Sequence, residues 1–232
     1  MIPSPHSLFY ALLGGVLPAL LWLWFWLKED SARPEPRGLI LFSFIAGMAG
    51  VIVVFPLEQF AYARLGGGLL LLLSWAFIEE IVKYLVTVYA DLRTRFFDEP
   101  IDAPIYFITV ALGFSALENV LFMLASFNNG EFMGGLITGN LRFLGATLLH
   151  VVASGSIGIA LGFAFYKSRI IKVIATITGL TVAIAAHTAF NFFILQNHRK
   201  DTLIVLSVLW VGVIVLLYLF ERLKKIKPKN NR

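Results

Sequence analysis

Long apolar runs, separated by short polar or charged segments, divide the chain into seven parts of similar length. A helix needs about 20 mostly apolar residues to cross the hydrocarbon core of a bilayer, and the runs are of that order. Because lipid offers no hydrogen-bonding partner, each span must satisfy its own backbone groups, which a helix does. The pattern therefore predicts an all-α, polytopic membrane helix bundle that forms a single domain over residues 1–232. The predicted spans are 7–27, 38–57, 69–90, 103–127, 141–166, 174–195 and 203–220, followed by a basic tail at 221–232.

Composition agrees with this pattern and limits the kinds of binding partner that are expected. Hydrophobic residues make up 59% of the chain, charged residues 14%, and the mean hydropathy is +0.83, which is too apolar for a soluble domain of this length. The net charge of +5 lies mainly in 222–232, directly after an apolar run. A tail beside anionic lipid explains that excess, so we expect the lipid bilayer as a partner and no nucleic acid. The chain has no cysteine, which excludes disulfides, thiolate nucleophiles and cysteine-based metal sites.

Lysine and arginine are distributed unevenly between the two sides of the predicted bundle. Cytoplasmic loops of membrane proteins carry an excess of these residues, so their placement predicts orientation. With the N-terminus outside, the inner loops and the tail hold most of the 19. Lys83 lies within a span, and the outer side holds only Arg64, Arg142, Arg199 and Lys200. We therefore predict an N-terminus outside and a cytoplasmic C-terminus.

The third run, residues 69–90, is interrupted near its middle by Glu79, Glu80 and Lys83. Charged groups at this depth cost several kcal/mol each, so something must offset them. At about 100° per residue, the two glutamates point in neighbouring directions and Lys83 lies one turn further along, between them. Lys83 can offset one carboxylate, and a structural ion pair would explain that much. The second, adjacent glutamate favours a functional interpretation.

Other polar residues lie within the later spans at a similar expected depth. Counting about 1.5 Å per residue from the outer end of each span places Glu79, Glu118, His150 and His187 roughly 12 to 15 Å deep. A lone buried histidine or asparagine is more often a helix–helix hydrogen bond than a catalyst. Four helices that bring polar groups to one level favour a shared cavity. His187 and Asn191 are four residues apart and so lie on one helix face.

This set of residue types suits hydrolysis. A carboxylate in a low-dielectric site beside a like charge is a good general base for water. Histidine and asparagine N–H groups can stabilise the oxyanion that forms when the water attacks a carbonyl. A glutamate mechanism of this kind requires no cofactor. Alternatively, the acids and imidazoles could hold zinc, which activates water as a Lewis acid, with candidate ligands Glu79, Glu118, His150 and His187.

Three common signatures of intramembrane proteases are missing from the sequence. No His-Glu-x-x-His occurs, which disfavours the usual zinc pattern. The aspartates all fall in connectors, which leaves no pair for an aspartyl mechanism. The segment Val152-Ala153-Ser154-Gly155 lacks the first glycine of a rhomboid-like Gly-x-Ser-Gly motif.

A series of short motifs, in order along the chain, instead resembles the PrsW family of intramembrane proteases, which is related to the CAAX-processing peptidases. The acidic pair fits a Glu-Glu-x-x-Lys motif, and the fourth span carries a Phe-x-x-x-Glu motif. The matching segments are Pro34–Arg37, Glu79–Lys83, Phe97–Asp102, Gly113–Asn119, His150 and His187–Asn191. The resemblance covers residues 33–191 and is specific as a set, although each motif alone is weak.

The resemblance implies a role for each candidate residue. Glu79 would be the general base, with Glu80 and Lys83 tuning its basicity. Glu118 and His150 would orient water or bind a metal. His187 and Asn191 would form the oxyanion site.

The resemblance also implies a substrate and a location. The family cleaves single-span membrane proteins, of which an anti-sigma factor in an envelope-stress cascade is the best-known example. Cleavage is expected near the extracytoplasmic side of a bacterial or archaeal plasma membrane.

Two other classes of function use similar residues. A proton-coupled transporter or channel also places Glu, Lys and His at mid-membrane, but inverted repeats or matching broken spans are not evident. A catalytically silent scaffold of the same family could bind a membrane partner through small residues such as Gly158 and Gly162. Such a scaffold would be expected to have lost one of the glutamates or histidines.

Overall fold

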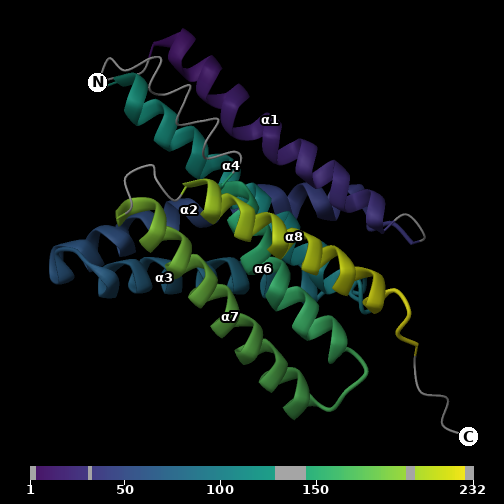
Figure 1. Ribbon diagram of the computed structural model, residues 1–232. Coiled ribbons are helices and arrows are strands. Elements are labelled where there is room, and N and C mark those ends of the chain that lie inside the picture. The colour runs from purple at the N-terminus through teal and green to yellow at the C-terminus, as the bar shows by residue number, and fades with distance from the viewer. Residues whose placement is uncertain (1–3, 31–32, 129–144, 197–201, 228–232) are drawn as a thin grey trace, which may run out of the picture.

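The computed structural model describes residues 4–30, 33–128, 145–196 and 202–227, and over these residues it is helical without strands (Figure 1). The expected all-α bundle is therefore confirmed. The predicted loop before residue 141, the first residues of the predicted fifth span and the end of the basic tail lie outside the described residues. The helices are α1 Pro5–Glu29, α2 Arg37–Leu65, α3 Leu69–Thr87, α4 Asp102–Asn128, α6 Ala146–Phe163, α7 Arg169–Gln196 and α8 Thr202–Leu223, with a short π-helix, η1, at Val88–Leu92.

Six of the described helices are long and apolar enough to cross a membrane, which makes the protein a multi-pass membrane protein. The remaining helix, α3, is apolar at both ends but holds Glu79, Glu80 and Lys83 near its middle. α3 runs on into η1 rather than ending in a sharp turn. Single π-helical turns of this kind frequently occur near functional sites.

Local sequence signals mark several helix ends. Ser4 caps α1 by accepting a hydrogen bond from the Ser7 backbone N–H at 3.1 Å, and Pro5 follows at the first helical position, where its missing N–H costs nothing. α2 extends to Leu65, beyond the predicted end at residue 57, and continues past Pro56. The turn from α2 to α3 uses Gly66 and Gly68 at positive φ, a conformation that favours glycine.

α4 and α6 form the interior of the bundle. In the most apolar segment of each helix, 72% of the residues of α4 and 78% of those of α6 are buried inside the protein. The corresponding share is 17% for α7 and 22% for α1 and α8. α4 packs along α1, α2 and α6, while α7 packs against α6 and α3. This arrangement places the polar middle of α3 against α6 and α7, inside the protein rather than in lipid.

α2 and α4 cross at very short range through a pair of glycines. A Cβ atom at Gly47 would lie 2.1 Å from the carbonyl oxygen of Val110, and one at Gly113 would lie 1.9 Å from that of Phe44. Small residues at helix crossings let backbones approach closely in membrane proteins. The crossing fixes α4, and with it Glu118, against the rest of the bundle.

We predict that Gly113→Ala destabilises the protein by about 1 to 3 kcal/mol, because the added methyl group has no space between two backbones. Gly38→Ala is the matched control, since a Cβ there meets nothing within 4 Å. Thermal unfolding of both variants in detergent measures the difference. Equal unfolding temperatures for the two variants would show that the crossing is not tightly packed.

Candidate active site

The polar middle of α3 is buried within the bundle. Glu79 is 5% exposed, Glu80 0% and Lys83 1%, so none of the three charges faces lipid. The helical spacing predicted from the sequence brings Lys83 onto the same face as both glutamates. Its Nζ lies 2.5 Å from Glu80 Oε1 and 3.9 Å from Glu79 Oε2.

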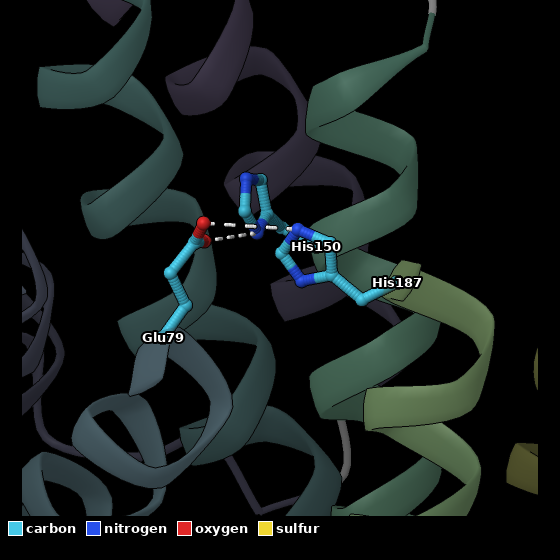
Figure 2. A group of neighbouring side chains, drawn as sticks. All are labelled: Glu79, His150 and His187. Atoms are coloured by element: carbon cyan, nitrogen blue, oxygen red, sulfur yellow. Dashed lines mark ion pairs between the residues drawn. The ribbon is translucent and has the colours of Figure 1, made fainter. Parts of the chain in front are cut away.

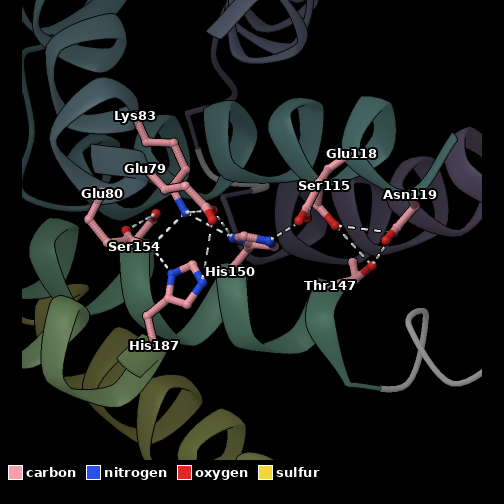
Figure 3. A network of polar contacts seen from close by, with 10 residues as sticks. All are labelled: Glu79, Glu80, Lys83, Ser115, Glu118, Asn119, Thr147, His150, Ser154 and His187. Carbon is pink, nitrogen blue, oxygen red and sulfur yellow. Dashed lines mark hydrogen bonds and ion pairs between the residues drawn. The ribbon is translucent and has the colours of Figure 1, made fainter. Parts of the chain in front are cut away.

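Glu80 is the acceptor that joins three helices (Figure 3). Besides the 2.5 Å contact from Lys83, it accepts hydrogen bonds from His187 Nδ1 of α7 at 2.8 Å and from Ser154 Oγ of α6 at 3.1 Å. Charge-assisted hydrogen bonds of this length are among the stronger ones in proteins. The Glu80 carboxylate is thus fully engaged, and it fixes the ring of His187 with Nε2 turned away from it.

His150 of α6 is held at both ring nitrogens. Lys83 Nζ lies 2.8 Å from its Nδ1, and Glu118 Oε2 of α4 lies 3.0 Å from its Nε2. Because an ammonium group can only donate, Nδ1 is the acceptor and Nε2 carries the hydrogen that it donates to Glu118. The structure therefore brings Glu118 and His150 together, as two adjacent parts of the same cluster.

Glu79 lies beside these groups without a close contact to either imidazole (Figure 2). Its carboxylate oxygens lie 3.8 Å from His187 Nε2 and 4.0 Å from His150 Nδ1, which is too long for a direct hydrogen bond. Glu79 Oε2 is buried and has no hydrogen-bond partner among the described residues. Polar atoms at this separation are commonly bridged by water or by an ion.

The donor set of Glu79, His150 and His187 also fits a metal ion. One ligand atom from each lies within 4.8 Å of the others, whereas zinc bonds of 2.0 to 2.2 Å place tetrahedral ligands about 3.3 Å apart. A small closure of the side chains would therefore suffice. The far nitrogen of each imidazole is held by a glutamate, Glu80 or Glu118, which is the usual support of a metal-binding histidine. Lys83 would have to leave His150 Nδ1.

A further polar chain extends along α4 and α6 next to Glu118. Ser115 Oγ and Thr147 Oγ1 are 3.0 Å apart, and Asn119 Nδ2 donates to Thr147 Oγ1 at 3.0 Å (Figure 3). These contacts tie the two interior helices together at the level of the site. They explain Asn119 as a residue that fixes the α4–α6 packing.

Asn191 is the one candidate that the structure does not join to the cluster. It lies one turn beyond His187 on α7 and is partly exposed. No hydrogen bond connects it to the other six candidates in the described part of the chain. Its place on the same helix face as His187 is unchanged.

Two residues near the site were missed by the sequence analysis. Ser154 lies four residues after His150 on α6, a spacing that could have identified it. Glu58 was assigned to a connector, but it belongs to α2 and lies partly buried near Glu79 and Glu118. Its position depends on how α2 packs in three dimensions, so the sequence offered no signal for it.

Comparison with known proteins identifies the family of this chain. The model of the PrsW family intramembrane metalloprotease matches residues 35–220, so the chain belongs to that family. A protease PrsW of Geobacillus kaustophilus is 30% identical over 70% of this chain and 68% of its own length. A protease PrsW of Bacillus subtilis is 27% identical over 81% of this chain and 84% of its own, and one of Clostridioides difficile is 23% identical over 86% and 84%. No solved structure matches the chain.

Membership of this family makes the protein an intramembrane protease of the cell membrane. The matched region, 35–220, contains the whole polar cluster of α3, α4, α6 and α7. The transporter alternative does not share this support. A silent scaffold of the same family would share it, but it would be expected to have lost one of the candidate glutamates or histidines, and all of them are present in this chain.

We predict that Glu80→Gln destabilises the protein by about 3 to 5 kcal/mol, because it leaves the buried Lys83 ammonium without its closest counter-charge. Glu221→Gln is the matched control. Glu221 and Lys224 form the same kind of pair, three residues apart and 2.5 Å long, but on the surface, where such pairs contribute about 0 to 1 kcal/mol. Chemical or thermal unfolding of the two variants provides the comparison. Equal losses would mean that Glu80 has no special structural role.

Proposed function

We propose that the protein hydrolyses a peptide bond of a membrane-anchored protein, at the cluster of Glu79, His150 and His187. The observation that carries this proposal is the arrangement of Glu79. Its buried Oε2 lacks a hydrogen-bond partner among the described residues, and gaps of 3.8 and 4.0 Å separate the carboxylate from two imidazole nitrogens. A water molecule fits between groups at this separation, with hydrogen bonds to both sides.

Glu79 is the proposed general base. Its carboxylate takes a proton from the attacking water, as a general base must lie within hydrogen-bond reach of the proton that it removes. Glu80 is less suited to this role because three donors already occupy its carboxylate oxygens. The different surroundings of the two adjacent glutamates favour different roles, with Glu79 as the base and Glu80 as the residue that positions its neighbours.

Lys83 and Glu80 have proposed supporting roles. The Lys83 ammonium lies 3.9 Å from Glu79 Oε2 and stabilises negative charge on the base before it accepts the proton. Glu80 in turn holds Lys83 and the ring of His187 in place. Glu118 has the same role toward His150, so that both imidazoles face Glu79 in a fixed orientation.

Stabilisation of the oxyanion is assigned to His187 and Asn191. His187 can donate through Nε2 only when its ring is protonated, and the Glu80 carboxylate at Nδ1 stabilises that form. Asn191 lies on the same face of α7 and offers amide N–H groups. Hydrogen-bond donors that are already in position where negative charge develops contribute a large part of enzymatic rate enhancement.

A metal-dependent chemistry at the same residues is the second candidate. Glu79, His150 Nδ1 and His187 Nε2 would hold zinc, because three lone-pair donors converge there and each imidazole has a glutamate behind it. When bound, zinc would supply Lewis-acid polarisation of the substrate carbonyl and of water. In that case Glu79 acts as a ligand. The family description as a metalloprotease supports this candidate.

The proposed substrate is a single-span membrane protein of the anti-sigma-factor type, cleaved near the extracytoplasmic side. The sequence supports the location through the predicted orientation, in which the N-terminus is outside and the C-terminus cytoplasmic. Family membership supports a protein substrate within the membrane. The bilayer positions the enzyme and the substrate span in the same layer.

We predict that Glu79→Gln and His187→Ala each lower cleavage of a co-reconstituted single-span substrate by at least about 100-fold, the usual minimum contribution of a general base or of an oxyanion donor. Glu221→Gln, a surface variant far from the cluster in the chain, keeps wild-type activity. Gel analysis of substrate cleavage in proteoliposomes measures the rates. Thermal unfolding of each variant confirms that it is folded. Wild-type-like cleavage by either site variant would refute the roles assigned here.

Elemental analysis of the purified protein distinguishes the two chemistries. If the metal-dependent chemistry operates, we predict about one zinc per chain in the wild type and strong loss of zinc in His150→Ala and His187→Ala. A chelator then removes metal and activity together. Full activity in protein without zinc, unaffected by chelator, would instead favour the glutamate mechanism.

A further inference from the structure

A groove of about 280 Å³ lies between α1 and α2, at the end of the bundle where α1 finishes and α2 begins. Both helices pack along α4, but they make little contact with one another, so the groove remains open between them. Leu23 and Phe44, which are buried, lie at its floor. Leu20 and Leu41 line it as well and are 43% and 60% exposed, which leaves the groove open to the surrounding lipid.

The same groove has a polar end. Asp30, Glu35 and Arg37 line it together with the apolar residues. Asp30 is 3% exposed, and its Oδ2 has no hydrogen-bond partner in the part of the chain that the structure describes. Arg37 is exposed and forms no ion pair with any described residue. A buried carboxylate oxygen without a partner is costly, and such a group usually marks a missing partner.

Negative charge dominates around Asp30. Burial, together with the nearby Asp102 and Glu99 carboxylates, raises the pKa of Asp30 to about 7, although Lys224 acts in the opposite direction. Burial likewise raises the pKa of Glu35, which also accepts a hydrogen bond from Tyr106 Oη. Lys224 is itself paired with Glu29 at 2.7 Å and Glu221 at 2.5 Å. The buried Asp30 and the half-buried Glu35 are therefore short of positive charge, and a cation would be favoured beside Asp30.

The lining of the groove indicates what can occupy it. Its floor is apolar, its rim opens toward lipid, and its end is acidic. An acyl chain matches the apolar floor and the lipid-facing opening, and a cationic head group matches the acidic end.

We propose that this groove binds one phospholipid with a primary-amine head group, of the phosphatidylethanolamine type. The acyl chain lies along Leu20, Leu23, Leu41 and Phe44, the ammonium group donates to Asp30 Oδ2 and Glu35, and the phosphate contacts Arg37. A primary ammonium group supplies N–H donors for charge-assisted hydrogen bonds, which the quaternary ammonium of phosphatidylcholine lacks. The anionic phosphatidylglycerol has no cation for the carboxylates. This site is separate from the proposed proteolytic cluster.

The full-length protein in detergent is incubated with an equimolar mixture of phosphatidylethanolamine, phosphatidylcholine and phosphatidylglycerol that carry the same acyl chains. Native mass spectrometry then measures the lipid that remains bound. We expect one phosphatidylethanolamine per chain, preferred over the other two by at least about tenfold, as charge-assisted hydrogen bonds allow. Asp30→Asn is expected to bring this preference close to unity. The exposed Asp98, which does not line the groove, provides the control, and Asp98→Asn keeps the preference.

A second pair of variants tests the groove if Asp30→Asn does not fold. Leu20→Trp fills the groove from its lipid-facing rim, whereas Leu21→Trp changes the neighbouring residue, which is 56% exposed and does not line the groove. We expect the first variant to lose the bound lipid and the second to retain it. Equal retention of the three lipids by the wild type overturns the proposal, as does equal lipid binding by the two tryptophan variants. Selective retention of phosphatidylglycerol would also overturn it, because Arg37 alone would then determine binding.

Discussion

The structure depends on the buried Glu80 carboxylate and the three groups that donate to it. Lys83 on the same helix, Ser154 on α6 and His187 on α7 converge on its oxygens at 2.5, 3.1 and 2.8 Å. In a membrane protein an isolated charge at this depth costs several kcal/mol, so each partner is needed to offset the free-energy cost of burying the others. The same contacts bring α3, α6 and α7 together and fix the ring of one histidine. Stability and the geometry of the site therefore have a common origin.

Adjacent glutamates on α3 have opposite surroundings as a result. Glu80 is saturated with donors, whereas Glu79 faces two imidazole nitrogens across gaps of 3.8 and 4.0 Å. The other ring nitrogen of each imidazole is hydrogen-bonded to a glutamate, that of His187 to Glu80 and that of His150 to Glu118. The arrangement leaves one carboxylate and two nitrogens directed at a common point. This convergence fits activated water or a metal ion, and it supports the peptide hydrolysis proposed for this member of the PrsW family.

Much of this could be predicted from the sequence because membrane proteins have few structural options. Apolar runs of spanning length predicted an all-helical bundle, and the shared depth of Glu79, Glu118, His150 and His187 predicted that they would meet. Helical periodicity placed Lys83 next to both glutamates. Spacing places Ser154 on the same face of α6 as His150. Its contact with Glu80 and the position of Glu58 were not predictable, because both depend on helix rotation and packing. Spacing alone likewise suggested that Asn191 acts with His187, but the structure leaves it apart from the cluster.

A double-mutant cycle between Glu80 and Lys83 tests the central claim most directly. The free energy of unfolding is measured for the wild type, Glu80→Gln, Lys83→Met and the double variant. If the buried pair organises the site, the double variant loses less stability than the sum of the single variants by about 1 to 3 kcal/mol, because neither partner is left as an uncompensated buried charge. Additive losses within about 0.5 kcal/mol would contradict the account, since the two residues would then act independently.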